Sequence, residues 1–481
     1  MLPHLLVILP FLFAVLIFSC GKRYFAARFL LVTCSVLYFS LTFYIFFAVR
    51  FNLPGLTPTA TSYIAFIPGD TIQSTVLVIT AIIFLATSVY SFCILPIKRV
   101  QKSQIENETL MPKNIFLGIL AAFVGSMTVV ALARNFGLLW VAMEATTLLS
   151  APLIILRRNA GSIEAMWKYM LICSVGIGLA LFGTMLMAHS SQLAGIVVTG
   201  LDFSSFQDTR ESLNPIWFKT AFIFILAGYG TKMGLAPFHT WLPDAYSEAP
   251  SSVSSLLSGT LVNCSFLAIA RFRQIAPSAV APFCDRLMLA LGLFSIAVAA
   301  VFIVGQRDFK RMLSYSSVEH MGLILIFFAL SSEYLHMHML FHSMIKAALF
   351  MIAGNVLMMY GTRSVASVRG MLQRSPLLSI LWIAGILLIC GTPPSPLFIT
   401  ELFLILKSGL QLGGIILILL FAVFCAMTYI MISMTMGKSD DLVPEPKPVS
   451  HVLNAVPLAL IVAVILLGIS ASLITSLPNQ F

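Results

Sequence analysis

Charge is scarce in this chain. Asp, Glu, Lys and Arg make up only 10% of its 481 residues, whereas soluble domains carry about 25%. Long polar segments are also missing, because the longest ones, at about 51–70, 96–112, 189–214 and 437–451, are only loop-sized. These absences exclude a soluble globular protein and argue against a separate soluble domain.

Cysteine pairs of the kind that bind metals are absent as well. The eight cysteines are scattered, and no Cys-x-x-Cys occurs, although zinc and iron–sulfur sites commonly use that spacing. Most of these cysteines lie inside apolar runs, where a thiol behaves as a small apolar side chain. We therefore expect no metal and no cofactor on this chain, and any redox chemistry to reside on another polypeptide.

What the chain does contain is apolar runs long enough to cross a bilayer, which takes about 20 residues. They recur from end to end and predict an all-α polytopic membrane protein with about 14 transmembrane helices. The predicted spans lie near residues 3–20, 27–49, 71–95, 113–133, 136–156, 164–188, 215–237, 250–270, 282–304, 312–330, 335–360, 376–408, 412–436 and 452–476.

The positions of the basic residues predict the orientation. In a signal peptide the positive charge precedes the apolar region, but here Lys22, Arg23 and Arg28 follow the first run, at residues 1–20. We therefore expect a retained first span, with the N-terminus on the outer side of the cell (inner) membrane.

With that start, the cations divide unequally between the two sides. The inner loops and span edges hold eighteen of the 28, namely Lys22, Arg23, Arg28, Lys98, Arg99, Lys102, Lys113, Arg157, Arg158, Lys168, Arg307, Lys310, Arg311, Arg363, Arg369, Arg374, Lys438 and Lys447. The outer side holds seven, namely Arg50, Arg134, Arg210, Lys219, Arg271, Arg273 and Arg286. This excess follows the positive-inside rule, so the net charge of +10 requires no nucleic-acid partner.

Several ionisable residues lie inside predicted spans. Lys232 follows the nearly wholly apolar residues 216–229 and precedes Pro237. A charge at the centre of a membrane helix costs about 2.5 to 3.5 kcal/mol even on lenient scales, so a chain that keeps Lys232 is expected to use its charge. The other candidates are Glu144, His320, His342, Lys346 and Glu401.

This set of residue types suits proton transfer. Moving a proton through hydrocarbon requires groups that gain and lose it, and buried Asp, Glu, Lys and His are the usual members. His342 and Lys346 are four residues apart, which places them on one helix face. We call Glu144, Lys232, His320, His342, Lys346 and Glu401 the candidate relay.

Prolines interrupt two of the spans that carry these residues. Pro237 follows Lys232, and Pro393 and Pro394 precede Glu401. Proline frees backbone groups that need other partners or water, and irregular backbone at membrane depth is tolerated where it lines a polar cavity. Because the two breaks lie five spans apart, they also indicate an internal repeat, as in many transporters.

Other interpretations remain open at this stage. Glu144 and Glu401 could each form a structural ion pair between helices, and His320 could be an ordinary interfacial residue. Lys407 is expected to reach toward the membrane surface. Residues expected at interfaces, at caps or in loops are His336, His338, His189, His451, Asp244 and Glu248.

The chain resembles the antiporter-like subunits shared by respiratory complex I, Mrp-type cation/proton antiporters and energy-converting hydrogenases. Residues 232–250 resemble the central signature of that family, and residues 314–322, 341–355 and 391–402 resemble further family segments. The likeness spans about residues 113–436. Residues 135–148 are most similar to the F-type membrane subunit of formate-hydrogenlyase-like nickel–iron hydrogenase complexes.

The resemblance implies an architecture of fourteen helices containing two inverted five-helix repeats, each with a broken helix. Residues 1–112 would form helices 1–3, residues 113–271 the first repeat, residues 281–436 the second repeat and residues 452–476 the last helix. It implies that proton translocation is driven by redox chemistry or coupled ion flow in partner subunits, both membrane and peripheral.

The resemblance also implies roles for individual residues. Glu144 and Lys232 would form a carboxylate–lysine pair in the first repeat, and Glu401 would end the pathway in the second. His320, His342 and Lys346 would carry the proton along the middle of the membrane. Apart from the roles that the resemblance implies, we take His239, Asp244, Glu248 and Asn263 as candidate supporting positions.

One position departs from the family pattern. Many relatives have a lysine in the eighth span where this chain has Asn263. An amide side chain does not titrate, so a relay through that helix would need water.

Three functions are compatible with these residues. The first is a non-catalytic, proton-translocating subunit of a redox complex of the hydrogenase or NADH dehydrogenase type. The second is a subunit of a cation/proton antiporter or another ion-coupled complex, with protons or sodium as the ion. The third is a structural membrane subunit with a vestigial channel.

Overall fold

The computed structural model describes residues 2–50, 64–65, 70–94, 111–156, 159–193, 195, 200–436 and 450–476. The predicted loops at 51–70, 96–112 and 437–451 lie almost wholly outside these residues. Lys98, Arg99, Lys102, Arg157, Arg158, Lys438 and Lys447 lie outside them too, as does the side chain of Arg50.

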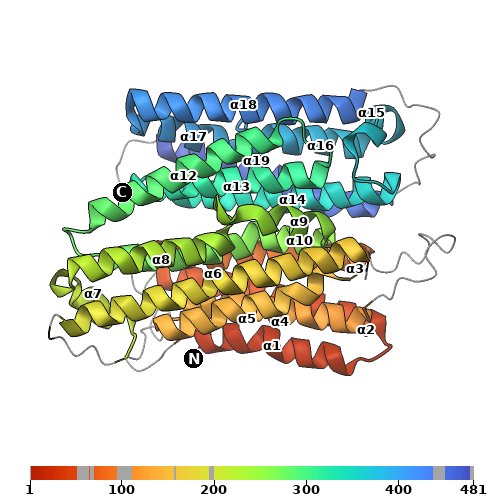
Figure 1. The fold of residues 1–481 in the computed structure, drawn as a ribbon. Helices are drawn as coiled ribbons and strands as arrows, with labels where there is room; N and C mark the ends of the chain where they lie inside the picture. The colour runs from red at the N-terminus through yellow and green to blue at the C-terminus, as the bar shows by residue number, and fades with distance from the viewer. Residues whose placement is uncertain are drawn as a thin grey trace.

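The described chain is a bundle of long helices that lie side by side (Figure 1). In chain order they are α1 (Leu2–Ser19), α2 (Tyr24–Arg50), α3 (Thr71–Ile94), α4 (Lys113–Leu132), α5 (Phe136–Ile154), α6 (Ala160–Leu193), α7 (Phe203–Asp208), α8 (Pro215–Met233), α9 (Trp241–Glu248), α10 (Ser251–Leu256), α11 (Val262–Gln274), α12 (Ala281–Ile303), α13 (Phe309–Ala329), α14 (Leu335–Tyr360), α15 (Met371–Arg374), α16 (Pro376–Ile389), α17 (Pro396–Lys407), α18 (Gly409–Met436) and α19 (Ala455–Ser476). Short 3-10 turns are η1 (Arg210–Ser212), η2 (Phe238–Thr240), η4 (Val365–Ser367) and η5 (His451–Asn454), whereas η3 (Leu257–Leu261) is a π-helical turn.

Thirteen helical segments within the described residues are long and apolar enough to cross a membrane. Together α8, η2 and α9 make one of them, and α10, η3 and α11 make another. The predicted span at 376–408 is divided between α16, which is a shorter apolar helix, and α17. The predicted all-α polytopic membrane fold is confirmed, while the number fourteen stays a prediction.

Glycines allow the closest helix pairs to approach. On α8, a Cβ at Gly228 would lie 2.6 Å from the carbonyl oxygen of Gly176 in α6. On α12, a Cβ at Gly292 would lie 2.7 Å from the carbonyl oxygen of Gly322 in α13. Small residues at helix contacts let backbones pack closely inside membranes, so these positions bring the helices that carry Lys232 and His320 tightly against their neighbours.

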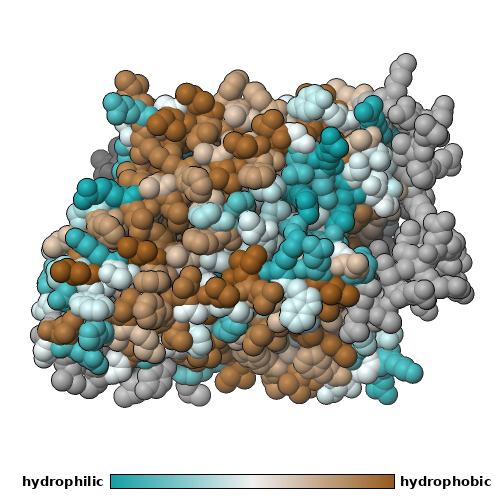
Figure 2. Space-filling view, in the orientation of Figure 1, coloured by the Kyte–Doolittle hydropathy of each residue, from teal (hydrophilic) through white to brown (hydrophobic). Residues whose placement is uncertain are grey.

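Nearly every residue of the segment formed by α10, η3 and α11 is buried, and most of α13 and α14 is buried too. By contrast, α1 and α18 present large apolar side chains outward. Figure 2 shows that hydrophobic side chains cover much of the visible face, while hydrophilic ones gather right of centre, where Figure 1 labels α9.

A buried cation, Arg271, connects α11 to the end of α4; the segment formed by α10, η3 and α11 is called the central segment below. Arg271 of α11 donates to the carbonyl oxygens of Ala131 at 2.6 Å and Ala133 at 2.5 Å, and it pairs with Asp70 at 3.6 Å. The sequence suggested only a residue at a span edge. The Arg271 guanidinium thus supplies hydrogen-bond donors to carbonyl oxygens at the end of α4, which would otherwise be buried without partners.

Candidate functional site

Lys232 lies at the end of a helix that stops inside the bundle. Helix α8 ends at Met233 because Gly234 takes the left-handed conformation, with φ of 84°, and its N–H bonds back to Gly230 and Thr231. Glycine enters that conformation without the steric penalty of a Cβ. The indole N–H of Trp241 donates to the carbonyl oxygen of Thr231 at 2.8 Å, so α9 is fastened back onto the end of α8 across the break at Pro237.

The ammonium of Lys232 is fully buried and has three acceptors, all on α5. Its Nζ donates to Thr146 Oγ1 and Thr147 Oγ1, each at 2.6 Å, and to the carbonyl oxygen of Met143. An ammonium carries three N–H donors, so this set satisfies the charged form completely. The sequence analysis did not include Thr146 and Thr147 among the candidate residues. Two adjacent hydroxyl side chains close to Glu144 in an apolar run could have indicated them.

Glu144 is close to this lysine but does not bind it directly. One carboxylate oxygen accepts a hydrogen bond from Ser174 Oγ of α6 at 2.9 Å, and the other is buried with no hydrogen-bond partner. The charge of Glu144 acts on Lys232 across the intervening space. The residue is therefore half-buried between α5 and α6, with one oxygen available to a further group.

Three buried histidines form a row in the second half of the chain. The Nδ1 of His320 on α13 lies 3.2 Å from the Nε2 of His338 on α14, and the rings of His320 and His342 are 4.7 Å apart between centroids. The Nδ1 of His338 lies 2.9 Å from Thr400 Oγ1 on α17. His338, which the sequence suggested as interfacial, is fully buried and extends the row to the residue before Glu401.

Lys346 is the second fully buried lysine of the candidate relay. Its Nζ donates to the carbonyl oxygen of Leu313 on α13 at 2.7 Å. Glu319, buried on α13, interacts with it electrostatically. Sequence reasoning passed over Glu319, although a carboxylate directly before His320 in an apolar helix marked it. One turn before Lys346, both ring nitrogens of His342 lack a hydrogen-bond partner.

Glu401 is buried in α17 directly beyond the second helix break. The break runs from the end of α16 to Pro396, and Ser395 Oγ closes it by donating to the carbonyl oxygen of Leu388 at 2.7 Å. Gly391, with φ of 64°, lies against the Glu401 carboxylate so closely that a Cβ there would collide with it. One oxygen of Glu401 has no hydrogen-bond partner.

Asn263 joins the central segment to α14. Its Nδ2 donates to the carbonyl oxygen of Gly259 at 2.7 Å and to Ser343 Oγ at 2.8 Å, whereas its Oδ1 is buried and unpartnered. Gly259 belongs to the π-helical turn η3, a local irregularity that occurs frequently at functional sites. Within the described residues no hydrogen bond links Asn263 to Lys232.

The remaining predicted positions gather around α9. His239 is buried, and the centroid of its ring lies 6.0 Å from that of Tyr315. Its Nδ1 has no hydrogen-bond partner. Asp244 pairs with Lys168 at 3.1 Å and with Arg311, and Glu248 pairs with Arg363 at 2.7 Å. These carboxylates, expected as caps or loop charges, instead connect α9 to other elements.

A surface pocket of about 460 Å³ opens at the C-terminal end of α9. Its lining comes from α9, from the residues just before α13 and its first turn, and from the segment after α14. It comprises Ser247, Glu248, Gln306, Arg307, Asp308, Arg311, Thr362, Arg363 and Ser364. In the part of the chain that the structure describes, no three His, Cys, Asp or Glu side chains are grouped to hold a metal ion.

The chain matches a protein family and its members by sequence. Residues 133–428 match the family described as NADH:quinone oxidoreductase/Mrp antiporter, TM. A hydrogenase-4 component F homolog of Methylacidiphilum infernorum is 37% identical over 319 residues, which cover 64% of this chain and 66% of that protein. Hydrogenase-4 component B of Escherichia coli is 27% identical over 349 residues, covering 69% of this chain and 49% of that protein. The matched segments thus span less than two thirds of each relative.

Solved structures share the whole fold. A chain of the membrane-bound sulfane sulfur reductase, an archaeal respiratory membrane complex, superposes with a TM-score of 0.82 at 20% identity, covering 98% of this chain and 94% of that one. A chain of the Mrp complex from Dietzia sp. gives 0.78 at 17% identity, with coverages of 98% and 96%. A chain of respiratory complex I from Thermus thermophilus gives 0.75 at 19% identity, with coverages of 98% and 98%.

Proposed function

Because the chain belongs to the NADH:quinone oxidoreductase/Mrp antiporter transmembrane family, we propose that it is a proton-translocating subunit of a membrane-bound redox complex. The complex would be of the hydrogenase or NADH dehydrogenase type. One observation carries the proposal above the others: Lys232 is a fully buried ammonium whose three donors are met at a helix break. A structural role alone would not require so costly a group at that depth.

Each relay residue has a proposed task. In the first repeat, Lys232 holds a proton on its amine, and Glu144 shifts the balance of that site through its charge. In the second repeat, Lys346 and the histidine row exchange protons, and Glu401 passes them toward the opposite side. Row neighbours within hydrogen-bond distance, such as His320 and His338 at 3.2 Å, are spaced for direct transfer.

Four further residues support these steps. Asn263 positions Ser343, the neighbour of His342, through a 2.8 Å hydrogen bond. His239, Asp244 and Glu248 hold α9, the helix that follows the break after Lys232. Because Asn263 does not titrate, water must complete the step from Lys232 to the histidine row.

We place the chain in the cell (inner) membrane with its N-terminus outside, following the excess of cations on alternate loops. Residues 113–271 then form the first repeat and residues 281–436 the second, preceded by residues 1–112 and followed by residues 452–476. In this orientation the pocket at the end of α9 faces the inner side.

The partners we propose are membrane and peripheral subunits that carry out the redox reaction and hold its cofactors. The hydrogenase names of the two sequence relatives favour this assembly. A cation/proton antiporter is the second candidate, favoured by the fold shared with a chain of the Mrp complex at a TM-score of 0.78; protons or sodium would be its ions.

Purification of the tagged chain in mild detergent, followed by identification of its partners, tests the assembly. Nickel–iron or iron–sulfur subunits are expected. A set of small antiporter subunits without redox proteins would instead establish the second candidate. Proton uptake by vesicles that contain the complex, measured during redox turnover, tests translocation itself, and turnover without proton movement would contradict it.

A further inference from the structure

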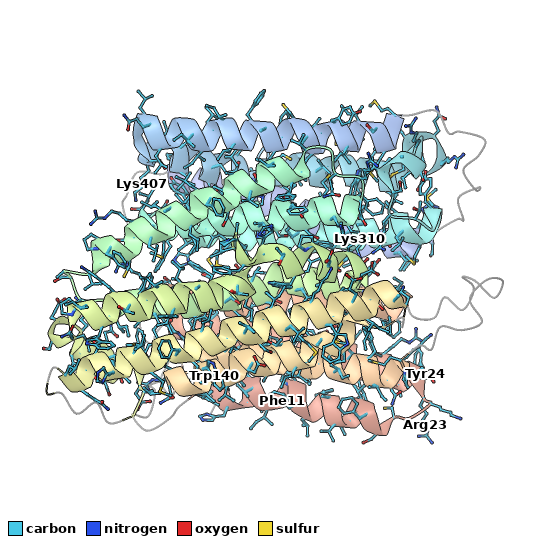
Figure 3. All side chains as sticks on the ribbon, viewed as in Figure 1. Phe11, Arg23, Tyr24, Trp140, Lys310 and Lys407 are labelled. Carbon is cyan, nitrogen blue, oxygen red and sulfur yellow. The ribbon has the colours of Figure 1, made fainter. Side chains whose placement is uncertain are left out.

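Lys310 is a buried lysine outside the candidate relay. It is the second residue of α13 and only 1% exposed. Figure 3 shows it right of centre, in the region where Figure 1 labels α9. Its neighbours Asp308 and Arg311 line the 460 Å³ pocket, as does Ser247, whose carbonyl oxygen it binds. Lys310 thus lies directly behind the pocket wall.

The hydrogen bonds of Lys310 suit both of its protonation states. Its Nζ donates to the carbonyl oxygens of Ser247 at 3.0 Å and Ala249 at 2.8 Å. An ammonium has three N–H donors and a neutral amine has two. Loss of one proton therefore leaves both hydrogen bonds intact, in contrast to Lys232, where three acceptors are satisfied only by the ammonium.

Charged groups from three elements face this amine. Asp308 precedes it at the start of α13, Glu248 ends α9, and Arg363 follows α14; all three act on it electrostatically. Arg363 pairs with Glu248 at 2.7 Å and with Asp308 at 3.7 Å. No carboxylate in the described residues forms an ion pair with Lys310, so no partner locks its ammonium in the charged form.

From Lys310 a polar face of α13 leads into the bundle. Ser314 and Ser317 follow at intervals of four and three residues, which places them on one side of the helix, and both are fully buried. Their hydroxyls donate to the carbonyl oxygens of Lys310 at 2.8 Å and Leu313 at 3.3 Å, which leaves oxygen lone pairs free to accept. The same Leu313 carbonyl oxygen binds Lys346.

We propose that Lys310 is a proton-loading residue that connects the inner-side pocket to Lys346. The neutral amine takes a proton from the water of the pocket, and the resulting ammonium gives one up toward the neutral amine of Lys346. Lys310 thereby returns to its neutral form, and no other reactant is consumed. This inlet enters the second repeat without passing Lys232, and it rests on the proposed function above.

Two substitutions test the proposal in vesicles that contain the complete complex. Lys310→Arg and Lys310→Gln both keep N–H donors for the two carbonyl oxygens, but neither releases a proton at neutral pH. We expect assembly and redox turnover to persist, while protons moved per turnover fall about a hundredfold, the lower end for a positioned acid–base group. Lys22→Gln, at an exposed turn between α1 and α2, is the matched control and should pump normally.

Native pumping by either variant would overturn the proposal, because the Lys310 amine would then serve only to hold the end of α9 through its hydrogen bonds. Failure of both variants to assemble would overturn it too, since Lys310 would then be a structural support. Lys232→Met in the same vesicles separates this proposal from the proposed function. If Lys232→Met pumps normally, the proposed function itself fails; if it does not pump while both Lys310 variants do, only the inlet fails.

Discussion

The Nζ of Lys232 binds the carbonyl oxygen of Met143, the residue directly before Glu144, rather than the Glu144 carboxylate itself. Glu144 instead accepts from Ser174 on α6. The two residues of the expected carboxylate–lysine pair therefore share a backbone segment of α5 but have separate hydrogen-bond partners. Each can change protonation without first breaking a direct bond to the other, and the coupling between them is electrostatic.

Replacement of the buried lysine should stop translocation. Lys232→Met keeps an unbranched apolar chain of similar length but removes the titratable group, so proton movement per redox turnover should fall about a hundredfold or more. Assembly should persist, because Thr146 retains its hydrogen bond to Met143 within α5. The measurement is proton uptake by vesicles, with subunit composition as the control. Undiminished proton uptake would show that Lys232 is not a relay residue.

Glu144→Gln should reduce pumping nearly as much. Glutamine can still accept the hydrogen bond from Ser174 but carries no charge to act on Lys232, so only the electrostatic coupling is lost. Ser174→Ala is the matched variant, because it removes the hydrogen bond and keeps the charge; it should lower pumping less than Glu144→Gln does. If Glu144→Gln pumps at the native rate, the carboxylate is structural.

The threonines around Lys232 should prove functional. Thr146→Val together with Thr147→Val leaves the ammonium with one acceptor instead of three, at about 1.5 to 3 kcal/mol for each hydrogen bond to a charged group. We expect pumping to fall at least about tenfold, since 1.4 kcal/mol corresponds to a factor of ten. Thr184→Val in α6 is the control, because that buried hydroxyl bonds only to its own helix at Ala180. Equal pumping in the double variant and the control would contradict the assignment.

Two histidines of α14 provide an internal comparison. His338→Phe should interrupt the row between His320 and Thr400 and lower proton uptake strongly. His336→Phe removes only contacts to Thr71 and Thr75 at the edge of α3 and should pump almost normally. Vesicle assays of the two variants, side by side, decide the point: similar pumping would remove His338 from the pathway.

Gly391→Ala should destabilise the second helix break. A residue with a Cβ pays about 1 to 2 kcal/mol in the left-handed conformation, and this Cβ would also displace the Glu401 carboxylate. The expected result is a lower Tm of the purified complex in detergent and reduced pumping. Gly414→Ala on α18 is the control, because nothing lies within 4 Å of its added Cβ and its backbone is helical. An unchanged Tm for Gly391→Ala would contradict the need for glycine there.

Particular residues show how far the sequence carried the site. Lys232, Lys346 and Glu401 stood out because a charge within an apolar run is visible without any knowledge of the fold. Thr146 and Thr147 did not, because threonine is common in membrane helices and only its position opposite Lys232 makes it notable. His338 was misplaced because closeness to a span end predicts exposure, whereas α17 and the ring of His320 cover it.

Hydropathy and charge by themselves determined the membrane class, the approximate spans and the presence of ionisable groups within them. These are properties of consecutive residues, and the cost of burying polar groups in hydrocarbon makes them decisive. Only the tertiary structure decided which groups meet. The acceptors of Lys232 lie 85 to 89 residues earlier in the chain, and the face that a helix turns toward them depends on packing. A helix that is apolar on every side carries no pattern that reveals this rotation, so Lys310 became recognisable only once α9 was seen to lie against it.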